Sequence, residues 1–279
     1  MSAKKFIDIK KILREKAPTA YKLMPGFIIG WLQRKLHEEE INRGMEYLGQ
    51  FEGLKHNDEI LKYLKIDVVV KNAHHIPKDE SVIFASNHPL GGLDGMALIK
   101  AVGEVRPDIR FIVNDILRNL KNFGDIFVGV NKVGNSSRHA LSTIEEVYAS
   151  NAAILIFPAG LVSRKGDEGI KDLEWNKSFI SKAIKYNKPI IPVHIEGQNS
   201  KFFYNLARWR KRLGIKANLE MLFLPDEMFK QQGKTIKIHF GEKIEPSVFD
   251  KKHTEKVWAE KLRNYIYSTD FKKDIRFKG

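Results

Sequence analysis

Short runs of β-branched residues alternate with stretches of helical spacing from residue 66 onward, and this alternation constrains the fold more than any other feature. Strands that alternate with helices favour an α/β sandwich with a largely parallel sheet. We therefore predict a central mixed, largely parallel sheet flanked by helices. The expected strands are residues 66–70, 82–85, 109–113, 126–130, 153–157, 190–195 and 235–240, and the expected helices are residues 94–102, 138–150, 177–186, 202–213 and 254–267.

The first 65 residues differ from the rest and are predicted to be helical. Residues 1–35 hold nine Lys or Arg against two acidic residues, beside large apolar side chains such as Trp31. That composition is typical of a helix lying on a membrane surface. The same apolar side chains would serve equally well in a helix that caps the core, and both interpretations stay open. We predict a helical N-terminal extension over residues 1–65 and an α/β domain over residues 66–279.

The composition excludes several classes of function. With 43% hydrophobic and 29% charged residues the chain can build a core, which excludes intrinsic disorder and collagen. It contains no cysteine, so disulfides, thiolate catalysis and cysteine-based metal sites are excluded, and a reducing compartment is favoured. The histidines, His74 and His75 among them, show no convincing metal-ligand spacing, and no metal site is expected.

The net charge of +14 indicates an anionic partner, which could be an acidic membrane face, a phosphorylated ligand or nucleic acid. Residues 201–216 concentrate this charge, with six Lys or Arg, no acid, and interleaved aromatic residues. A charge run is usually a solvated helix face. A patch for lipid headgroups or for an acidic carrier protein is the sharper interpretation. No recognised nucleic-acid-binding motif is visible, so we expect no nucleic acid partner.

No segment is predicted to span a bilayer. Uncharged stretches such as residues 23–33 and 151–163 are well short of the roughly 20 apolar residues that a transmembrane helix needs. The N-terminus lacks the core of a signal peptide, because charge returns at Asp8 and Lys10. We therefore expect a cytoplasmic protein, either soluble or peripherally associated with the inner face of the membrane.

Residues 86–96 carry the clearest chemical signal. They follow a predicted strand, contain a glycine-rich turn and open a helix, an order that places side chains at the carboxyl end of a sheet. There His88 could act as a general base whose ring Asp94 orients. The two residues are six apart and meet only if Gly91 and Gly92 fold the chain back. On these residues alone, a helix cap at Asp94 beside an ordinary loop histidine is the simpler interpretation.

Four segments in a fixed order resemble a known enzyme family. Residues 87–95 (NHPLGGLDG) resemble the first motif of the glycerolipid acyltransferase family, the lysophosphatidic acid acyltransferase-like enzymes, and are closest to its bacterial hemolysin-like branch. Residues 127–132 (FVGVNK), 157–164 (FPAGLVSR) and 188–194 (KPIIPVH) are similar to the second, third and fourth motifs. The resemblance covers about residues 82–197 and implies the α/β fold of that family.

Three departures from the family pattern bear on the acceptor. Five residues, rather than the usual four, separate His88 from Asp94, a spacing that the resembled branch tolerates. Ala159 replaces the glutamate of the Phe-Pro-Glu-Gly motif, and Leu161 replaces the usual threonine. Those positions help to hold a phosphorylated acceptor in typical members, so a glycerol-phosphate acceptor is in doubt. The resembled branch includes enzymes that esterify the hydroxyl of a 3-hydroxy-acyl amino acid, whose carboxylate a lone cation could bind.

The resemblance implies an O-acyltransferase. It would move a fatty acyl group from a thioester of acyl carrier protein or coenzyme A to the hydroxyl of a lysolipid, of lysophosphatidate or N-acyl amino acid type, with no metal and no resident cofactor. His88 is the implied general base and Asp94 orients it. Lys132 and Arg164 would hold the anionic group of the acceptor, and the Gly160 N–H would stabilise the oxyanion. The implied substrate-binding residues are Asn87, Gly91, Gly92, Lys132, Gly160, Ser163 and Arg164.

Three alternatives compete with this function. The chain could be a non-catalytic module that binds lipid or acyl carrier protein on the same fold. It could be a basic nucleic-acid-binding protein, whose affinity would then fall steeply with salt. Within the enzyme class, water could replace the alcohol, which would make the protein a thioester hydrolase.

Overall fold

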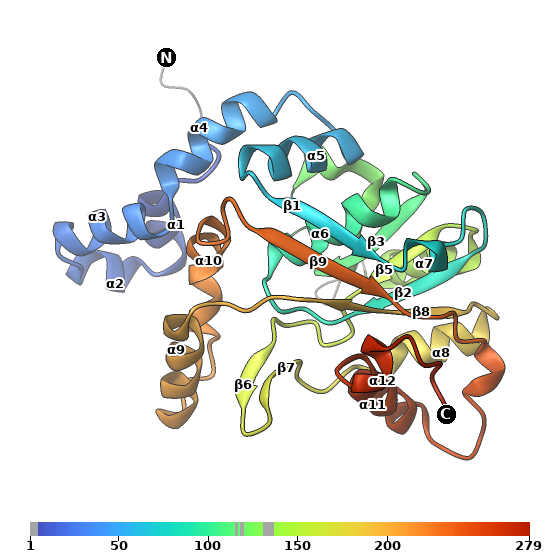
Figure 1. Ribbon diagram of the computed structural model, residues 1–279. Coiled ribbons are helices and arrows are strands. Elements are labelled where there is room, and N and C mark those ends of the chain that lie inside the picture. Colours follow the sequence, from blue (N-terminus) through green and yellow to red (C-terminus); the bar gives the residue numbers. More distant parts are fainter. Residues whose placement is uncertain (1–4, 115–116, 118–119, 131–136) are drawn as a thin grey trace.

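The computed structural model describes residues 5–114, 117, 120–130 and 137–279, and a sheet lies at its centre between two layers of helices (Figure 1). Within these residues the sheet has seven strands in the order β1-β9-β8-β2-β5-β3-β4. The strands are β1 (Asp67–Lys71), β2 (Val82–Ser86), β3 (Ile109–Asn114), β4 (Phe127–Val130), β5 (Ala153–Ile156), β8 (Ile190–Ile195) and β9 (Thr235–Phe240).

Five neighbouring strands, β8, β2, β5, β3 and β4, run parallel to one another. β9 pairs antiparallel with β8, and β1 pairs parallel with β9. Every residue of β2 and β5 is buried, as expected for central strands covered on both faces. The predicted mixed, largely parallel sheet is confirmed. The carboxyl ends of the five parallel strands lie at one edge of the sheet. The first motif follows β2 and the third follows β5, and these two strands are neighbours.

Helices cover both faces of the sheet. α5 and α6 pack on one face, and α8 and α11 pack on the other (Figure 1). Side chains of β2 alternate between the two cores: Phe84 lies in the core beneath α6, and Ile83 lies in the core beneath α8. The helices are α1 (Ile9–Lys16), α2 (Pro18–Leu23), α3 (Gly26–Lys35), α4 (Glu38–Leu48), α5 (Gly53–Tyr63), α6 (Gly92–Gly103), α7 (Ser137–Ala149), α8 (Ser178–Lys185), α9 (Lys201–Arg212), α10 (Leu224–Phe229), α11 (Glu255–Ile266) and α12 (Thr269–Lys272), with short 3₁₀ turns η1 (Ala73–His75), η3 (Lys121–Ile126), η4 (Leu219–Phe223) and η5 (Pro246–Val248).

The hairpin formed by β6 (Arg164–Gly166) and β7 (Gly169–Lys171) forms a separate two-stranded sheet. Its strands are three residues each, too short to show a period of two in the sequence. The hairpin begins at Arg164, which is also the last residue of the third motif.

The N-terminal helices α1–α4 lie beside the sheet at one end of the molecule (Figure 1). α3 is joined to α10 by an ion pair of 2.8 Å between Lys35 and Asp226. The His37 ring, just before α4, stacks on Phe229 of α10 with 4.2 Å between ring centroids. The division of the chain after residue 65 remains a prediction, and in the structure this position lies between α5 and β1.

Candidate active site

The first and third motifs meet at the carboxyl edge of the sheet. β2 and β5 are parallel neighbours, so the segments that leave them run side by side. The His88 ring stacks on Phe157, with 4.1 Å between centroids and an angle of 15° between the ring planes. The Ser163 N–H donates to the His88 carbonyl oxygen at 2.8 Å. The fold thus unites two segments that lie about 70 residues apart in the sequence.

His88 and Asp94 form the pair that the sequence suggested. Nδ1 of His88 lies 2.9 Å from Oδ2 of Asp94. The same oxygen accepts hydrogen bonds from the backbone N–H groups of Leu90 (2.7 Å) and Gly91 (3.0 Å). Asp94 therefore caps the start of α6 and binds the imidazole at once, so the two interpretations of this residue are compatible.

The turn that joins the pair depends on Gly91. Its φ of 86° and ψ of −133° lie in a region that residues with a side chain rarely adopt. A Cβ there would lie 3.0 Å from Cδ2 of Leu224. Gly92 is the first residue of α6, and a Cβ there would meet nothing within 4 Å. The predicted double-glycine bend is therefore made by one glycine.

Exchange of these two glycines for alanine should give different results. Gly91→Ala is expected to lower the free energy of unfolding by about 1–3 kcal/mol, the usual cost of forcing a side chain into such backbone geometry. Gly92→Ala should leave stability unchanged or slightly higher, because alanine favours the helix. Urea denaturation of both variants measures the difference. Equal stability of the two would contradict the assignment of the bend to Gly91.

Burial dominates the electrostatics of the pair. The side chain of Asp94 is fully buried, and this burial raises the pKa of its carboxyl group. The hydrogen bonds from His88, Leu90 and Gly91 act in the opposite direction. An ionised carboxylate only accepts hydrogen bonds, so beside ionised Asp94 the proton of a neutral His88 resides on Nδ1. The lone pair is then on Nε2.

Nε2 of His88 is the reactive atom of this arrangement. The side chain is 16% exposed, and no residue in the described part of the chain hydrogen-bonds to Nε2. A neutral imidazole with a carboxylate on one nitrogen and a free lone pair on the other can accept a proton. The carboxylate then stabilises the imidazolium that forms. The arrangement is suited to removing a proton from a bound hydroxyl or water.

Asp172 is a part of the site that the sequence did not indicate. Oδ1 of this buried carboxylate accepts from the His88 backbone N–H at 3.1 Å and from Oγ of Ser163 at 2.6 Å. Oδ2 accepts from Nε1 of Trp175 at 2.8 Å, and the backbone N–H of Asp172 donates to the hydroxyl of Tyr267 at 3.0 Å. Asp172 therefore joins the His88 loop, the third motif and the end of α11. No motif marks it, because its partners are distant in the sequence.

Removal of this carboxylate should loosen the site. Asp172→Ala leaves three donors without their acceptor, and each buried unpaired donor costs about 1–3 kcal/mol. We expect a lower urea midpoint and a lower rate of acyl transfer. Asp167→Asn, at an exposed position in the β6–β7 turn, is the matched control and should change neither. Wild-type stability in Asp172→Ala would show that the network does not hold the loop.

Several predicted substrate-binding residues have structural partners. The Asn87 side chain is buried and binds the backbone of Ile195 in β8 through both its donor (2.9 Å) and its acceptor (2.6 Å). The Ser163 hydroxyl is bound to Asp172, as described above. The Gly160 N–H donates to the Phe157 carbonyl at 3.0 Å in a tight turn. Contact of these residues with substrate remains a prediction.

Two cations, Lys132 and Arg164, are predicted to bind the anionic group of the acceptor. Lys132 lies outside the described residues. Nη2 of Arg164 lies 2.7 Å from Glu220, a fully buried carboxylate that also binds Nε of Arg210 at 2.9 Å. The Arg164 guanidinium lies over the Phe203 ring and also donates to the Val162 carbonyl. Burial lowers the pKa of Arg164, and Glu220 opposes this effect.

Comparisons with known proteins show the family of the chain. A family model described as Acyltransferase matches residues 11–273. The chain belongs to this acyltransferase family. A lyso-glycine lipid O-acyltransferase of Bacteroides thetaiotaomicron is 40% identical over 262 residues, which cover 94% of this chain and 96% of that protein. A protein of the same name from Phocaeicola vulgatus is 39% identical over 262 residues, covering 94% of each chain. The predicted enzyme class, an acyltransferase, is confirmed.

A solved structure is also similar to this acyltransferase. The 1-acyl-sn-glycerophosphate (LPA) acyltransferase PlsC from Thermotoga maritima aligns over 97% of both chains, with 19% sequence identity and a TM-score of 0.48. At this distance nothing about substrate follows from the likeness.

Proposed function

We propose that this acyltransferase transfers a fatty acyl group from a thioester, of acyl carrier protein or coenzyme A, to the hydroxyl of a lysolipid acceptor. The observation that carries the proposal is the 2.9 Å contact between Nδ1 of His88 and Asp94 at the carboxyl edge of the sheet, with Nε2 not hydrogen-bonded to any residue that the structure describes. Relatives that are 39–40% identical over nearly their whole length, and are named lyso-glycine lipid O-acyltransferases, support it.

The reaction needs one base and no covalent enzyme intermediate. Nε2 of His88 takes the proton from the acceptor hydroxyl while its oxygen attacks the thioester carbonyl. The new C–O bond forms, the C–S bond breaks, and the imidazolium returns the proton to the departing sulfur. Asp94 stabilises the imidazolium during this cycle, and such general-base assistance contributes about 10²–10⁴-fold to the rate.

The acceptor that we propose is a lyso-glycine lipid, an N-acyl amino acid with a free hydroxyl and a carboxylate. Its class is supported by the names of the relatives and by Ala159 in place of the usual glutamate. Arg164 and Arg210 share the single carboxylate of Glu220, which leaves one positive charge unmatched among these three groups. Arg164 directly follows Ser163, whose N–H binds the His88 carbonyl. One net positive charge suits one carboxylate.

The surface around α9 is proposed to receive the donor and an anionic membrane on the cytoplasmic side. α2, α3 and α9 lie on the same side of the molecule (Figure 1). η4 joins α3 and α9, because its Phe223 ring lies 6.3 Å from that of Trp31 in α3 and 5.2 Å from that of Phe202 in α9, between ring centroids. Basic side chains of α9 flank exposed apolar ones, the composition of an interfacial surface. The most exposed apolar side chains here are Leu23, Phe27, Trp209, Leu213 and Leu222. No helix in the described part of the chain has the length and apolar character that crossing a bilayer requires.

Charged substitutions on this surface should weaken vesicle binding. Phe27→Asp and Leu213→Asp are each expected to lower affinity for phosphatidylglycerol vesicles by about tenfold or more, because burial of one such side chain is worth about 1.5–3 kcal/mol. Ile184→Asp on α8 introduces the same charge at an exposed apolar position elsewhere and is the control. Sedimentation with vesicles measures the binding. Equal vesicle binding by all three variants would show that this surface does not bind the membrane.

The proposed function is tested with the purified full chain. An acyl-carrier-protein or coenzyme A thioester is offered with N-(3-hydroxyacyl)glycine or with lysophosphatidate, and mass spectrometry detects the products. We expect the O-acylated glycine lipid, formed faster than phosphatidate. Free fatty acid as the only product would indicate a thioester hydrolase. Faster formation of phosphatidate would overturn the acceptor assignment.

A further inference from the structure

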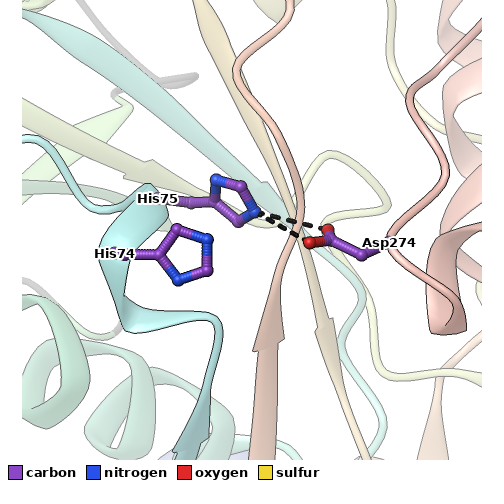
Figure 2. A group of neighbouring side chains, drawn as sticks. All are labelled: His74, His75 and Asp274. Carbon is purple, nitrogen blue, oxygen red and sulfur yellow. Dashed lines mark hydrogen bonds and ion pairs between the residues drawn. The ribbon is translucent and has the colours of Figure 1, made fainter.

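A second cluster of reactive side chains lies outside the His88 site. It is located where the segment after the edge strand β1 meets the segment after α12. His74 and His75 belong to η1, and Asp274 follows α12 by two residues. The His75 ring is directed at the Asp274 carboxylate, and the His74 ring lies beside it (Figure 2). One donor atom from each of the three side chains lies within 4.8 Å of the others. His75 and Asp274 are 199 positions apart, which explains why no metal-ligand spacing is visible in the sequence.

We propose that His74, His75 and Asp274 bind a divalent transition-metal ion, with Zn²⁺ as the best match. Two imidazole nitrogens and one carboxylate oxygen are a ligand set that suits Zn²⁺ rather than Mg²⁺ or Ca²⁺, which prefer oxygen ligands. Three protein ligands leave the fourth tetrahedral position to water, which the exposure of His74 and Asp274 allows.

The distances within the His75–Asp274 ion pair are compatible with shared coordination of one ion. Nε2 of His75 lies 3.3 Å from both carboxylate oxygens of Asp274. This is long for an N–H···O hydrogen bond, which is usually about 2.9–3.0 Å. It matches the separation of roughly 3.3 Å between two ligand atoms of a tetrahedral Zn²⁺ with bonds of about 2.0–2.1 Å. The exposed His74 ring has its centroid 4.1 Å from that of His75, and binding would require it to rotate so that one of its nitrogens reaches the same ion.

Both arms of the cluster are anchored to the core. Ile76, the residue after His75, is buried. Phe271 of α12, three residues before Asp274, is buried as well. The next residue, Ile275, is held on both sides: its N–H donates to the Asp270 carbonyl at 2.9 Å, and its carbonyl accepts from the Tyr265 hydroxyl at 2.8 Å. A bound ion would therefore cross-link two firmly placed segments, and it should raise the melting temperature of the protein.

The test is a calorimetric titration of the untagged full chain with ZnCl₂, with MgCl₂ and CaCl₂ as comparisons. We expect one saturable Zn²⁺ per chain and no binding of Mg²⁺ or Ca²⁺. His75→Ala and Asp274→Asn should each weaken Zn²⁺ binding by at least about tenfold, since even the loss of an outer-shell partner costs about 10–100-fold. Asp270→Asn, an exposed carboxylate on α12, and His253→Ala should bind as wild type does.

A melting curve without metal shows whether each variant is folded, and the same curve with Zn²⁺ gives a second readout. We expect Zn²⁺ to raise the melting temperature of wild type and of Asp270→Asn, but not of Asp274→Asn. Absence of saturable binding in wild type would overturn the proposal. Wild-type Zn²⁺ affinity in both His75→Ala and Asp274→Asn would also overturn it, and so would preferential binding of Mg²⁺. None of these outcomes depends on acyltransferase activity, so the two proposals stand or fall separately.

Discussion

Replacing His88 by alanine is expected to lower kcat for acyl transfer by about 10²–10⁴-fold, because the acceptor hydroxyl loses its general base. The imidazole acts only as the hydroxyl oxygen attacks. The losses in kcat and in kcat/KM should therefore be equal, with KM for the acceptor nearly unchanged. Release of the thiol from acyl-coenzyme A or acyl carrier protein, followed spectroscopically at saturating acceptor, measures the effect.

His253→Ala is the matched control for this variant. His253 packs on Trp258, with 4.9 Å between ring centroids, and takes no part in the His88 site. It should retain wild-type kcat. Circular dichroism and the urea midpoint show whether His88→Ala is folded. If His88→Ala is folded and its kcat is within about tenfold of wild type, His88 is not the general base. The loss in kcat would then be smaller than the contribution of a general base.

Replacing Asp94 by asparagine should separate catalysis from stability. The Asn carbonyl can still accept the backbone N–H groups of Leu90 and Gly91, so the start of α6 keeps its cap. The same carbonyl oxygen still accepts from Nδ1 of His88, but the neutral amide cannot stabilise an imidazolium as a carboxylate does. We expect kcat to fall by less than the roughly 10²–10⁴-fold that general-base assistance supplies, because the base remains and only the charge that stabilises its protonated form is lost.

The unfolding free energy of Asp94→Asn should stay closer to wild type than that of Asp94→Ala. The hydrogen bonds to the backbone persist, and the cost is the burial of the NH₂ group at the Oδ1 position, which has no partner among the described residues. Removal of the buried charge, whose desolvation raises the pKa of Asp94, also favours the variant. Asp94→Ala is the contrast: it leaves three N–H groups, those of Leu90, Gly91 and the His88 ring, without their acceptor, at a cost of about 1–3 kcal/mol for each that stays buried. Near-wild-type kcat in Asp94→Asn would show that the carboxylate serves only as a helix cap.

The sheet could be predicted because its central strands are apolar on both faces. β2 and β5 are continuous runs of buried residues between turns. Such a run can be recognised from four or five consecutive residues, without knowing which other segments pack against it. The His88–Asp94 pair could be suggested because both residues lie in one segment. Which glycine makes the bend could not, since the sequence shows neither the φ of Gly91 nor the Leu224 side chain beside it.

Contacts between distant segments lay beyond sequence reasoning. Asp172 lies 84 residues from the His88 N–H that it binds, and Glu220 lies 56 residues from Arg164. The sequence around Asp172 or Glu220 does not reveal that either carboxylate is buried, because the burial depends on how distant segments pack in the fold. The resemblance implied that Arg164 holds the anionic group of the acceptor, but it did not reveal that Arg164 and Arg210 share one carboxylate in the structure.

The most direct test of the central claim is a crystal structure of the full chain with a lyso-glycine lipid bound. The account predicts that the acceptor hydroxyl oxygen lies about 2.6–3.2 Å from Nε2 of His88, with Nδ1 still bound to Asp94. A lipid whose hydroxyl lies out of reach of His88, in contact with another basic group, would contradict it.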